Sequence, residues 1–251
     1  MPALAELVDY CDTTLRVGEI ADYANALNGL QVENSGSVKK IAAAVDVSTR
    51  SLQGAIDAGA NLLLVHHGMF WPGLRPVTKS LRRQLQLAFE NDLAIYSAHL
   101  PLDVHAEFGN NALLMRALGI QEFAPFLLEK GSLLGQIASA KTGLADLAKK
   151  LEHAVDGTVK VIASGPPTTA RIGVITGGAG GEIERVAAEG VDTFLTGEAP
   201  HWAAVAAEEL GVNLLLGGHY ATETFGVKAL AAHLAQKFAL EWTFLDLPPG
   251  L

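Results

Sequence analysis

Residues 61–71 have the sequence Asn-Leu-Leu-Leu-Val-His-His-Gly-Met-Phe-Trp, in which a short apolar run ends in two adjacent histidines and a glycine. A continuous apolar run of this length is typical of a strand that is covered on both faces of an α/β sheet. Open α/β sheets bind ligands just beyond the carboxyl ends of their strands. The stretch therefore predicts a buried strand with His66 and His67 at the edge where a ligand would bind.

The two adjacent histidines allow two interpretations. Neighbouring residues of a strand point to opposite faces, so the rings of His66 and His67 would normally diverge. The rings can converge on one site if the strand breaks into a loop at this point, which Gly68 permits. Otherwise one histidine belongs to the core and the other faces solvent. The stretch alone leaves both interpretations open.

The composition limits the classes of protein to which the chain can belong. Its 251 residues, of which 49% are hydrophobic and 18% charged, predict a globular fold of one large domain or two small lobes. No window approaches the roughly 18 apolar residues that a membrane span requires, and the N-terminal residues do not resemble a secretory signal. Cys11 is the only cysteine, which excludes an internal disulfide and favours a reducing compartment. We therefore predict a cytoplasmic protein with no membrane partner.

The net charge bears on the partners. A formal charge of −9 argues against general binding to nucleic acid, because affinity for a duplex depends mainly on neutralising phosphates. An anionic small-molecule substrate would need local positive charge. Bound metal ions could supply that charge.

The first half of the chain alternates strands and helices around the His-His stretch. Helices are predicted over residues 3–15, 49–58 and 79–90, and strands over residues 41–46 and 93–97 as well as in the His-His run. Ser48 is suited to cap the second of these helices and Gly59 to end it. A polar, turn-rich passage precedes residue 34. The strand–helix–strand order predicts right-handed crossovers and a largely parallel sheet.

The second half shows the same alternation. Strands are predicted over residues 133–140, 159–163, 171–176, 192–196, 213–216 and 242–245. Helices are predicted over residues 144–154 and 182–189, with two more that extend through Val205 and through His233. We accordingly predict one lobe over residues 1–125 and a second over residues 126–251.

The two halves also repeat one another. A shift of 131 positions carries His67 onto Glu198 and Trp71 onto Trp202 without a gap. A shift of 120 positions carries the strand at 93–98 onto residues 213–218, and with it His99 onto His219 and Asp103 onto Glu223. This repeat predicts two pseudo-symmetric α/β lobes with largely parallel or mixed sheets that face a shared site. Chance similarity is the alternative, because strand–helix–strand units resemble one another generically.

Polar residues follow the predicted strands in both halves and form a set of possible metal ligands. The set is His66, His67, His99, Asp103, His219 and Glu223, with Glu198 and His201 nearby by the repeat. Imidazole nitrogens and carboxylate oxygens are ligands of Zn, Mn, Fe and Ni sites, and a carboxylate can bridge two ions. His219 and Glu223 have i,i+4 spacing and would share one face of a helix.

Five motifs together resemble the dinuclear-metal family labelled GTP cyclohydrolase I type 2, which is named after an NGG-interacting factor. They are Asn28-Gly29-Leu30-Gln31-Val32, His66-His67-Gly68-Met69-Phe70-Trp71, Ser97-Ala98-His99-Leu100-Pro101-Leu102-Asp103, Thr196-Gly197-Glu198 and Gly218-His219-Tyr220-Ala221-Thr222-Glu223. Each motif alone is modest, but five motifs in the family's order are specific. The chain resembles the short bacterial members, because residues 118–135 leave no room for the extra domain that longer relatives carry between the lobes.

The resemblance implies two similar α/β lobes around a two-metal site and assembly as a homohexameric ring. The ligands that it implies are His66, His67, Asp103 and His219, with Glu223 bridging two divalent ions per chain. The metal is left open among Zn, Fe, Mn, Ni and Mg. His99, Glu198 and His201 are the candidates for moving a proton. His99 could instead orient a ligand or simply pack in the core.

Two further features have more than one interpretation. The glycine-rich loop at residues 177–181 could present amides to an anion, or could be a plain tight turn; it does not match a dinucleotide-binding fingerprint. Asp46 ends a predicted strand and could face the same site. His105, His153 and His233 are expected to be surface or packing residues.

These observations favour a metal-dependent hydrolase in which two ions activate a water molecule. By resemblance its substrate is GTP, whose imidazole ring water would open, but another nucleotide or a phosphoester would suit the same ions. The alternative is a non-catalytic, metal-binding regulatory or scaffold ring.

Overall fold

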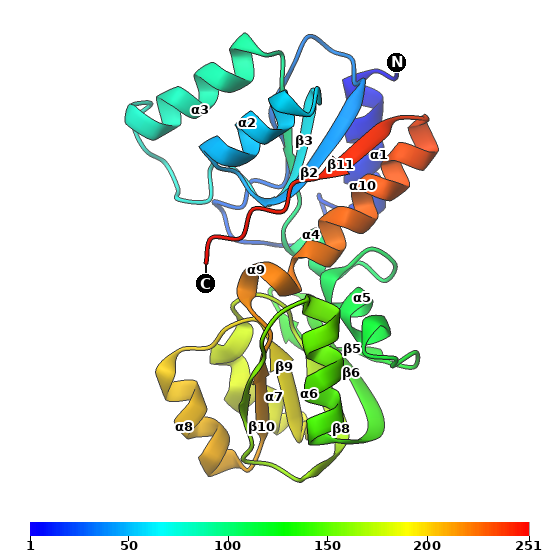
Figure 1. Cartoon of the computed structure of the whole chain (residues 1–251), viewed down its shortest axis with the longest axis vertical. Helices are drawn as coiled ribbons and strands as arrows, with labels where there is room; N and C mark the ends of the chain where they lie inside the picture. Colours follow the sequence, from blue (N-terminus) through cyan, green and yellow to red (C-terminus); the bar gives the residue numbers. More distant parts are fainter. Residues whose placement is uncertain (251) are drawn as a thin grey trace. The chain divides into compact units, whose positions relative to one another are not determined.

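The computed structural model describes residues 1–250 and has the predicted α/β class, with two β-sheets that are flanked by helices (Figure 1). The chain divides into two compact units. Unit 1 contains Met1–Leu102 and Gly226–Leu247, and unit 2 contains Asp103–Phe225 together with the chain end from Pro248. Among the described residues, no helix is both long enough and apolar enough to cross a bilayer.

This division differs from the predicted lobes at residues 1–125 and 126–251. Strand β11 (Glu241–Phe244) returns to unit 1 because it pairs in parallel with β2 (Lys40–Asp46). Helix α5 (Asn110–Ala117) belongs to unit 2 because it packs against α6 (Leu144–Val155) and the sheet beside it. Both differences arise from contacts between segments far apart in the sequence, which a local pattern does not encode.

The sheet of unit 1 has the order β1-β4-β3-β2-β11. Its remaining strands are β1 (Gly29–Val32), β3 (Leu62–His67) and β4 (Ala94–Ser97). β1 pairs antiparallel with β4, and the other neighbours are parallel. Every residue of β3 is buried, as the continuous apolar run predicted. The strand that ends in the two histidines is therefore the centre of this sheet.

The helices of unit 1 are α1 (Leu4–Leu15), α2 (Thr49–Asp57), α3 (Lys79–Glu90), and most of α4 (Leu100–Asp103) and of α10 (Thr224–Phe238). Ser48 caps α2 as predicted. Its hydroxyl accepts a hydrogen bond from the Ser51 amide, and the Ser51 hydroxyl accepts one from the Ser48 amide. Leu52 of α2 packs in one core with Leu63 and Val65 of β3. The cap and this core fix the helix against the strand that carries the histidines.

The sheet of unit 2 has the order β5-β6-β8-β9-β10-β7. Its strands are β5 (Ala124–Glu129), β6 (Ser132–Gly143), β7 (Lys160–Ile162), β8 (Thr168–Val174), β9 (Thr193–Thr196) and β10 (Asn213–Leu216). The pairs β8–β9 and β9–β10 are parallel, and the other pairs are antiparallel. The sheet is therefore mixed.

Both faces of this sheet are covered. The further helices of unit 2 are η1 (Ala179–Glu182), α7 (Ile183–Ala188), α8 (His201–Leu210) and α9 (His219–Thr222). Leu195 and Leu215 point into a core with α5 and α6, whereas Phe194 and Leu214 point into a second core with α7 and α8. This alternation follows the two-residue period of a strand.

The two units repeat the same arrangement of three parallel strands. In unit 1, Ile41 of β2 pairs with Leu62 of β3, and in unit 2, Ile172 of β8 pairs with Thr193 of β9. Both residues of the second pair lie 131 positions after their counterparts, so the predicted shift holds in the strand register. An antiparallel strand follows at the edge in each unit, β1 beside β4 and β7 beside β10.

The second predicted shift is wrong by one residue in the strands. Leu62 pairs with Ala94, whereas Thr193 pairs with Asn213, so β4 and β10 correspond at a shift of 119 positions and not 120. Unit 2 therefore has one extra residue between the end of β10 and His219. Gly218 lies there with φ +89°, a conformation that glycine adopts without strain.

Candidate metal centre

His66 and His67 are the last two residues of β3, so the strand continues through both histidines and does not break into a loop before them. Their ring centroids nevertheless lie 4.8 Å apart. Because β3 ends at this point, the two side chains can bend over the end of the sheet although they leave the backbone on opposite faces. The interpretation with one core histidine and one solvent histidine is wrong, since both residues are buried.

The protonation of His66 follows from its hydrogen bond. His66 Nδ1 lies 2.9 Å from the carbonyl oxygen of Ala98, just after the neighbouring strand β4. A carbonyl oxygen only accepts hydrogen bonds, so Nδ1 carries the proton. In the neutral ring, Nε2 then keeps the lone pair that a metal ion requires.

His67 has the same arrangement with a carboxylate. Its Nδ1 lies 2.9 Å from Asp46 Oδ1, and Asp46 is the residue that ends β2. A carboxylate that accepts the Nδ1 proton fixes the ring and makes Nε2 a stronger ligand. The structure thus gives Asp46 a defined place beside His67.

His99 follows strand β4 and is held by Asp22. Its Nδ1 lies 2.9 Å from Asp22 Oδ1, and its backbone amide donates to Asn28 Oδ1 at 2.7 Å. Burial acts to raise the pKa of the Asp22 carboxyl, but hydrogen bonds and charge attraction from His99, with hydrogen bonds from Asn28 and the Tyr23 amide, hold it below its ordinary value. Asp22 is therefore an anion that orients His99.

Together the three imidazoles of unit 1 have the properties of a metal site. One ligand atom from each of His66, His67 and His99 lies within 4.8 Å of the other two. In each ring Nδ1 is engaged in a hydrogen bond to oxygen, so Nε2 is the donor that each ring can offer to a metal. Neutral imidazole suits Zn, Fe, Cu and Ni ions. The family motifs assigned His99 a supporting part, whereas the geometry also makes it a possible ligand.

The loop after the histidines depends on Gly68. A Cβ at this position would overlap the side-chain amide of Gln31. That amide accepts a hydrogen bond from the Met69 backbone at 2.7 Å and donates to the carbonyl of Ala26. Gly68 therefore provides space for Gln31 and does not adopt a left-handed conformation. Gln31 of β1 thus joins the turn before its own strand to the loop that follows β3.

In unit 2 the corresponding polar residues form a second cluster. His219 Nε2 lies 3.2 Å from Glu223 Oε2, which confirms that the i,i+4 spacing brings the two side chains together. His219 Nδ1 lies 2.9 Å from Glu198 Oε1. Glu223 is buried and the Glu198 side chain is half exposed. The imidazole of His219 is thus held between two carboxylates.

These carboxylates determine the charge of His219. Burial acts to lower the pKa of the imidazole, but hydrogen bonds and charge attraction from Glu223 and then Glu198 outweigh it and raise the pKa to about 9. The same negative charges would attract a metal cation in place of the proton. One imidazole and two carboxylates are donors that suit several first-row divalent ions.

The glycine loop at residues 177–181 packs against this cluster. A Cβ at Gly177, whose φ is +70°, would overlap Glu223 Oε1. A Cβ at Gly180 would overlap Ala199. Close packing therefore explains these glycines, which favours the tight-turn interpretation.

Asp103 ends α4 and is buried. Its Oδ1 accepts a hydrogen bond from Asn110 Nδ2 at 2.7 Å. The next residue, Asn111, donates to the Leu134 carbonyl and accepts hydrogen bonds from the amide and hydroxyl of Thr176. The start of α5 thus fixes Asp103 to the sheet of unit 2.

The remaining histidines lie in different settings. His201 is the first residue of α8 and is exposed, and it does not belong to either group of possible ligands described above. His105 stacks on Phe108 with ring centroids 4.7 Å apart. His233 lies 2.6 Å from the Tyr10 hydroxyl. His105 and His233 therefore have packing contacts, as expected.

Two residues of the site were not identified from the sequence. Asp22 lies in a turn-rich passage 77 positions before His99, and Asn110 lies in a helix that was not predicted. Asn28 and Gln31 belong to a recognised motif, but their partners could not be assigned. The sequence offers one signal for these contacts, which is that a motif with the amide side chains of Asn28 and Gln31 precedes the histidine strand.

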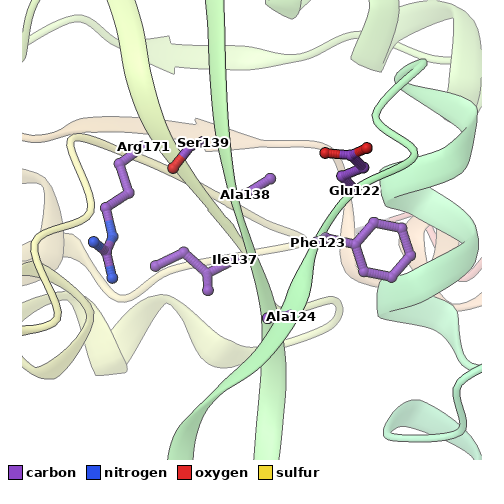
Figure 2. A pocket seen from close by; sticks show the side chains of 7 residues that line it. All are labelled: Glu122, Phe123, Ala124, Ile137, Ala138, Ser139 and Arg171. Carbon is purple, nitrogen blue, oxygen red and sulfur yellow. The ribbon is translucent and has the colours of Figure 1, made fainter.

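A cavity of about 320 Å³ lies on the sheet of unit 2 (Figure 2). Figure 2 shows Arg171 on one side of this cavity and Glu122 and Phe123 on the other. Its lining residues include none of the candidate metal ligands. The cavity and the histidine clusters are therefore separate features.

Comparison with known proteins gives consistent matches along the whole chain. The model of the Duf34/NIF3 (NGG1p interacting factor 3) family matches residues 2–249. A relative from Deinococcus radiodurans, named GTP cyclohydrolase 1 type 2 homolog, is 41% identical over 98% of this chain and 94% of its own. A relative of the same name from Pseudomonas aeruginosa is 39% identical over 98% of each chain. The crystal structure of TTHA1606 from Thermus thermophilus has a TM-score of 0.92 at 37% identity, with 100% of both chains covered.

Proposed function

Because the chain belongs to the Duf34/NIF3 family, as its motifs predicted, we propose that it is a metal-dependent hydrolase with two divalent ions per chain. The observation that carries this proposal is the histidine cluster of unit 1. Three imidazoles there have their Nδ1 atoms held by a carbonyl or a carboxylate, which makes Nε2 the metal donor of each ring. A packing role alone does not require this common orientation.

The proposed ligands are His66, His67, Asp103 and His219, with Glu223 as the bridging carboxylate. This set is transferred from the family motifs. It is supported by the buried hydrogen bond of Asp103 to Asn110 and by the contact of Glu223 with His219. When bound, two such ions acidify a water molecule and polarise the bond under attack. Donors of this kind suit Zn, Fe, Mn, Ni or Mg, so the supply of metal decides the ion.

Three further residues are proposed to move protons. His99 is held at Nδ1 by Asp22, so its Nε2 can accept a proton or bind a metal. Glu198 is half exposed and contacts His219, which allows it to exchange a proton with solvent. His201 is exposed at the start of α8, and a role for it requires that a substrate reach it.

GTP or another nucleotide is the proposed substrate class. The relatives named GTP cyclohydrolase 1 type 2 homolog support GTP. For GTP, one water would break the C8–N9 bond and open the imidazole ring, which leaves C8 as a formamide on N7. A second water would hydrolyse this formamide and release formate. A site with these donors would also suit a phosphoester.

The test is an activity screen of the metal-reconstituted protein with GTP, other nucleotides and simple phosphoesters. We expect turnover that requires metal and that falls by at least about a hundredfold in Glu223→Gln and Asp103→Asn. A matched control is Glu189→Gln, which changes an exposed carboxylate at the end of α7. Metal binding at two ions per chain without any turnover would contradict catalysis and favour a regulatory or scaffold ring.

We further propose that the chain assembles as a homohexameric ring in the cytoplasm. The ring is inferred from the family resemblance, and the compartment from the single, buried, reduced Cys11. Sedimentation velocity should give a mass close to six chains of 26.3 kDa. A monomer at all concentrations would contradict the ring.

A further inference from the structure

Two aromatic rings lie beside the histidine cluster of unit 1. Trp71, in the turn after β3, has its ring centroid 4.5 Å from that of His99 and 5.0 Å from that of His67. Tyr23, next to Asp22, lies 6.1 Å from His99 and 6.3 Å from Trp71, with its ring almost perpendicular to the indole. The two rings therefore border the imidazoles on one side.

These rings are not fully covered by the protein. Tyr23 is 51% exposed, and Trp71 is half-buried. The same two loops expose Leu27 and Leu74. Apolar surface that borders a cluster of polar, ligand-binding groups is typical of a binding site.

The two loops are also joined to one another. Asn25 Nδ2 donates a hydrogen bond to the Trp71 carbonyl. Between them the loops line a cavity of about 290 Å³, with Leu27 and Phe70 among its lining residues. Because the loops are tied together, the two rings are held in place before a ligand arrives, which lowers the entropy cost of binding.

We propose that Tyr23 and Trp71 form the wall on which the flat ring of a nucleobase stacks beside the metal centre. This inference rests on the proposed hydrolase function and specifies its substrate class. An aromatic face attracts a planar heterocycle through stacking, whereas a sugar or a phosphate gains little from it. The wall therefore selects a nucleotide over a simple phosphoester, and it places the base close to His67 and His99.

Binding can be measured without turnover, which separates this inference from the hydrolase proposal. Guanosine 5′-monophosphate and ribose 5-phosphate are titrated into the metal-reconstituted protein by calorimetry, with bound metal measured for each variant. The variants are Tyr23→Leu, Trp71→Leu and Trp71→Phe. The control is Trp242→Leu, which removes a partly exposed indole from β11 in the same unit.

We expect Tyr23→Leu and Trp71→Leu to weaken binding of the nucleotide about tenfold to a hundredfold, while binding of ribose 5-phosphate stays the same. Trp71→Phe should restore most of the affinity, and Trp242→Leu should have none of these effects. If the Trp71→Leu protein no longer binds metal, the test rests on Tyr23→Leu, because the Tyr23 side chain is half exposed and its loss disturbs the packing less.

Three results would overturn the proposal: no nucleotide binding to the wild type, equal affinity for ribose 5-phosphate, or unchanged nucleotide affinity in Tyr23→Leu with metal retained. Base-dependent binding with no turnover of any nucleotide or phosphoester would support the stacking wall and refute the hydrolase. Nucleotide turnover that is unchanged in both Tyr23→Leu and Trp71→Leu would support the hydrolase and refute the stacking wall.

Discussion

His67 Nδ1 lies 2.9 Å from Asp46 Oδ1, and the two residues are also paired across β3 and β2 at the ends of both strands. The hydrogen bond therefore depends on the strand register. A slip of one residue would move Asp46 to the other face of the sheet. The packing of unit 1 thus determines which nitrogen of His67 can bind a metal.

This relationship predicts that Asp46→Asn weakens metal binding without unfolding the protein. The amide can no longer stabilise the developing positive charge on His67, and loss of such a partner lowers metal affinity about tenfold to a hundredfold. Competition with a chelator measures the change. Asp57→Asn is the control, because Asp57 is a carboxylate of the same unit whose partner is the surface residue Gln53. Equal metal affinity in both variants would contradict the role of Asp46.

The hydrogen bond from Asn110 should contribute to the stability of the folded chain. Asn110→Ala removes the 2.7 Å hydrogen bond to the buried Asp103 carboxylate. We expect the free energy of unfolding of the metal-free protein to fall by about 1–3 kcal/mol, measured with urea. Asn91→Ala, which removes an exposed hydrogen bond to the Leu87 carbonyl, should change it by less than about 0.5 kcal/mol. Similar losses in the two variants would be inconsistent with this account.

Substitution of Gly177 can separate the effect of a steric clash from the effect of backbone strain. Gly177→Ala puts a residue at φ +70° and also places a Cβ on Glu223 Oε1, whereas Gly59→Ala has nearly the same φ, +71°, and nothing within 4 Å. Gly59→Ala should lose about 1–2 kcal/mol from strain alone. Gly177→Ala should lose more and should also reduce metal affinity, because Glu223 must move. The measurements are urea unfolding and metal titration, and identical losses would show that the clash has no effect.

The stability of the chain should fall in alkaline solution. Burial, and secondarily the charge of Asp12, raises the pKa of the Cys11 thiol above its ordinary 9.0, and burial likewise raises the pKa of the Tyr96 phenol above 10.0. The thiol is neutral in both states below about pH 8 and the phenol below about pH 9, so the contribution of each group is fully present there. At higher pH the unfolded chain releases protons that the folded chain retains, and each group lowers stability by about 1.4 kcal/mol per pH unit once the pH exceeds its ordinary pKa.

Urea unfolding at a series of pH values from about 8 to 10.5 measures this slope. Cys11→Ala should flatten the curve by the contribution of one group, although the deleted sulfur also lowers stability at every pH. The slope is therefore the quantity to compare, and parallel curves for the two proteins would refute the assignment to Cys11.

Local patterns predicted the elements that carry the site. The apolar run before His66 and the i,i+4 spacing of His219 and Glu223 each correspond to the structure because neighbouring residues determine them. The shift of 131 residues also holds, since a parallel register preserves sequence spacing across two strands. These features need no knowledge of distant contacts.

Distant contacts account for what the sequence did not reveal. β1 lies in a passage whose composition predicts turns, and four residues at a sheet edge carry too little apolar pattern to indicate a strand. Asp22 was missed because its partner His99 is 77 positions away. The return of β11 to unit 1 is likewise a pairing with β2 that only the folded chain defines.

The position shared by Asp46 and Gly177 has a consequence for how such a chain could evolve. The two residues are equivalent under the shift of 131 positions, yet one supplies a carboxylate to His67 and the other leaves room for Glu223. The same place in two similar sheets therefore serves hydrogen bonding in one unit and close packing in the other. A carboxylate at position 177 would collide with Glu223, so the side chain that serves unit 1 at this position is excluded from unit 2.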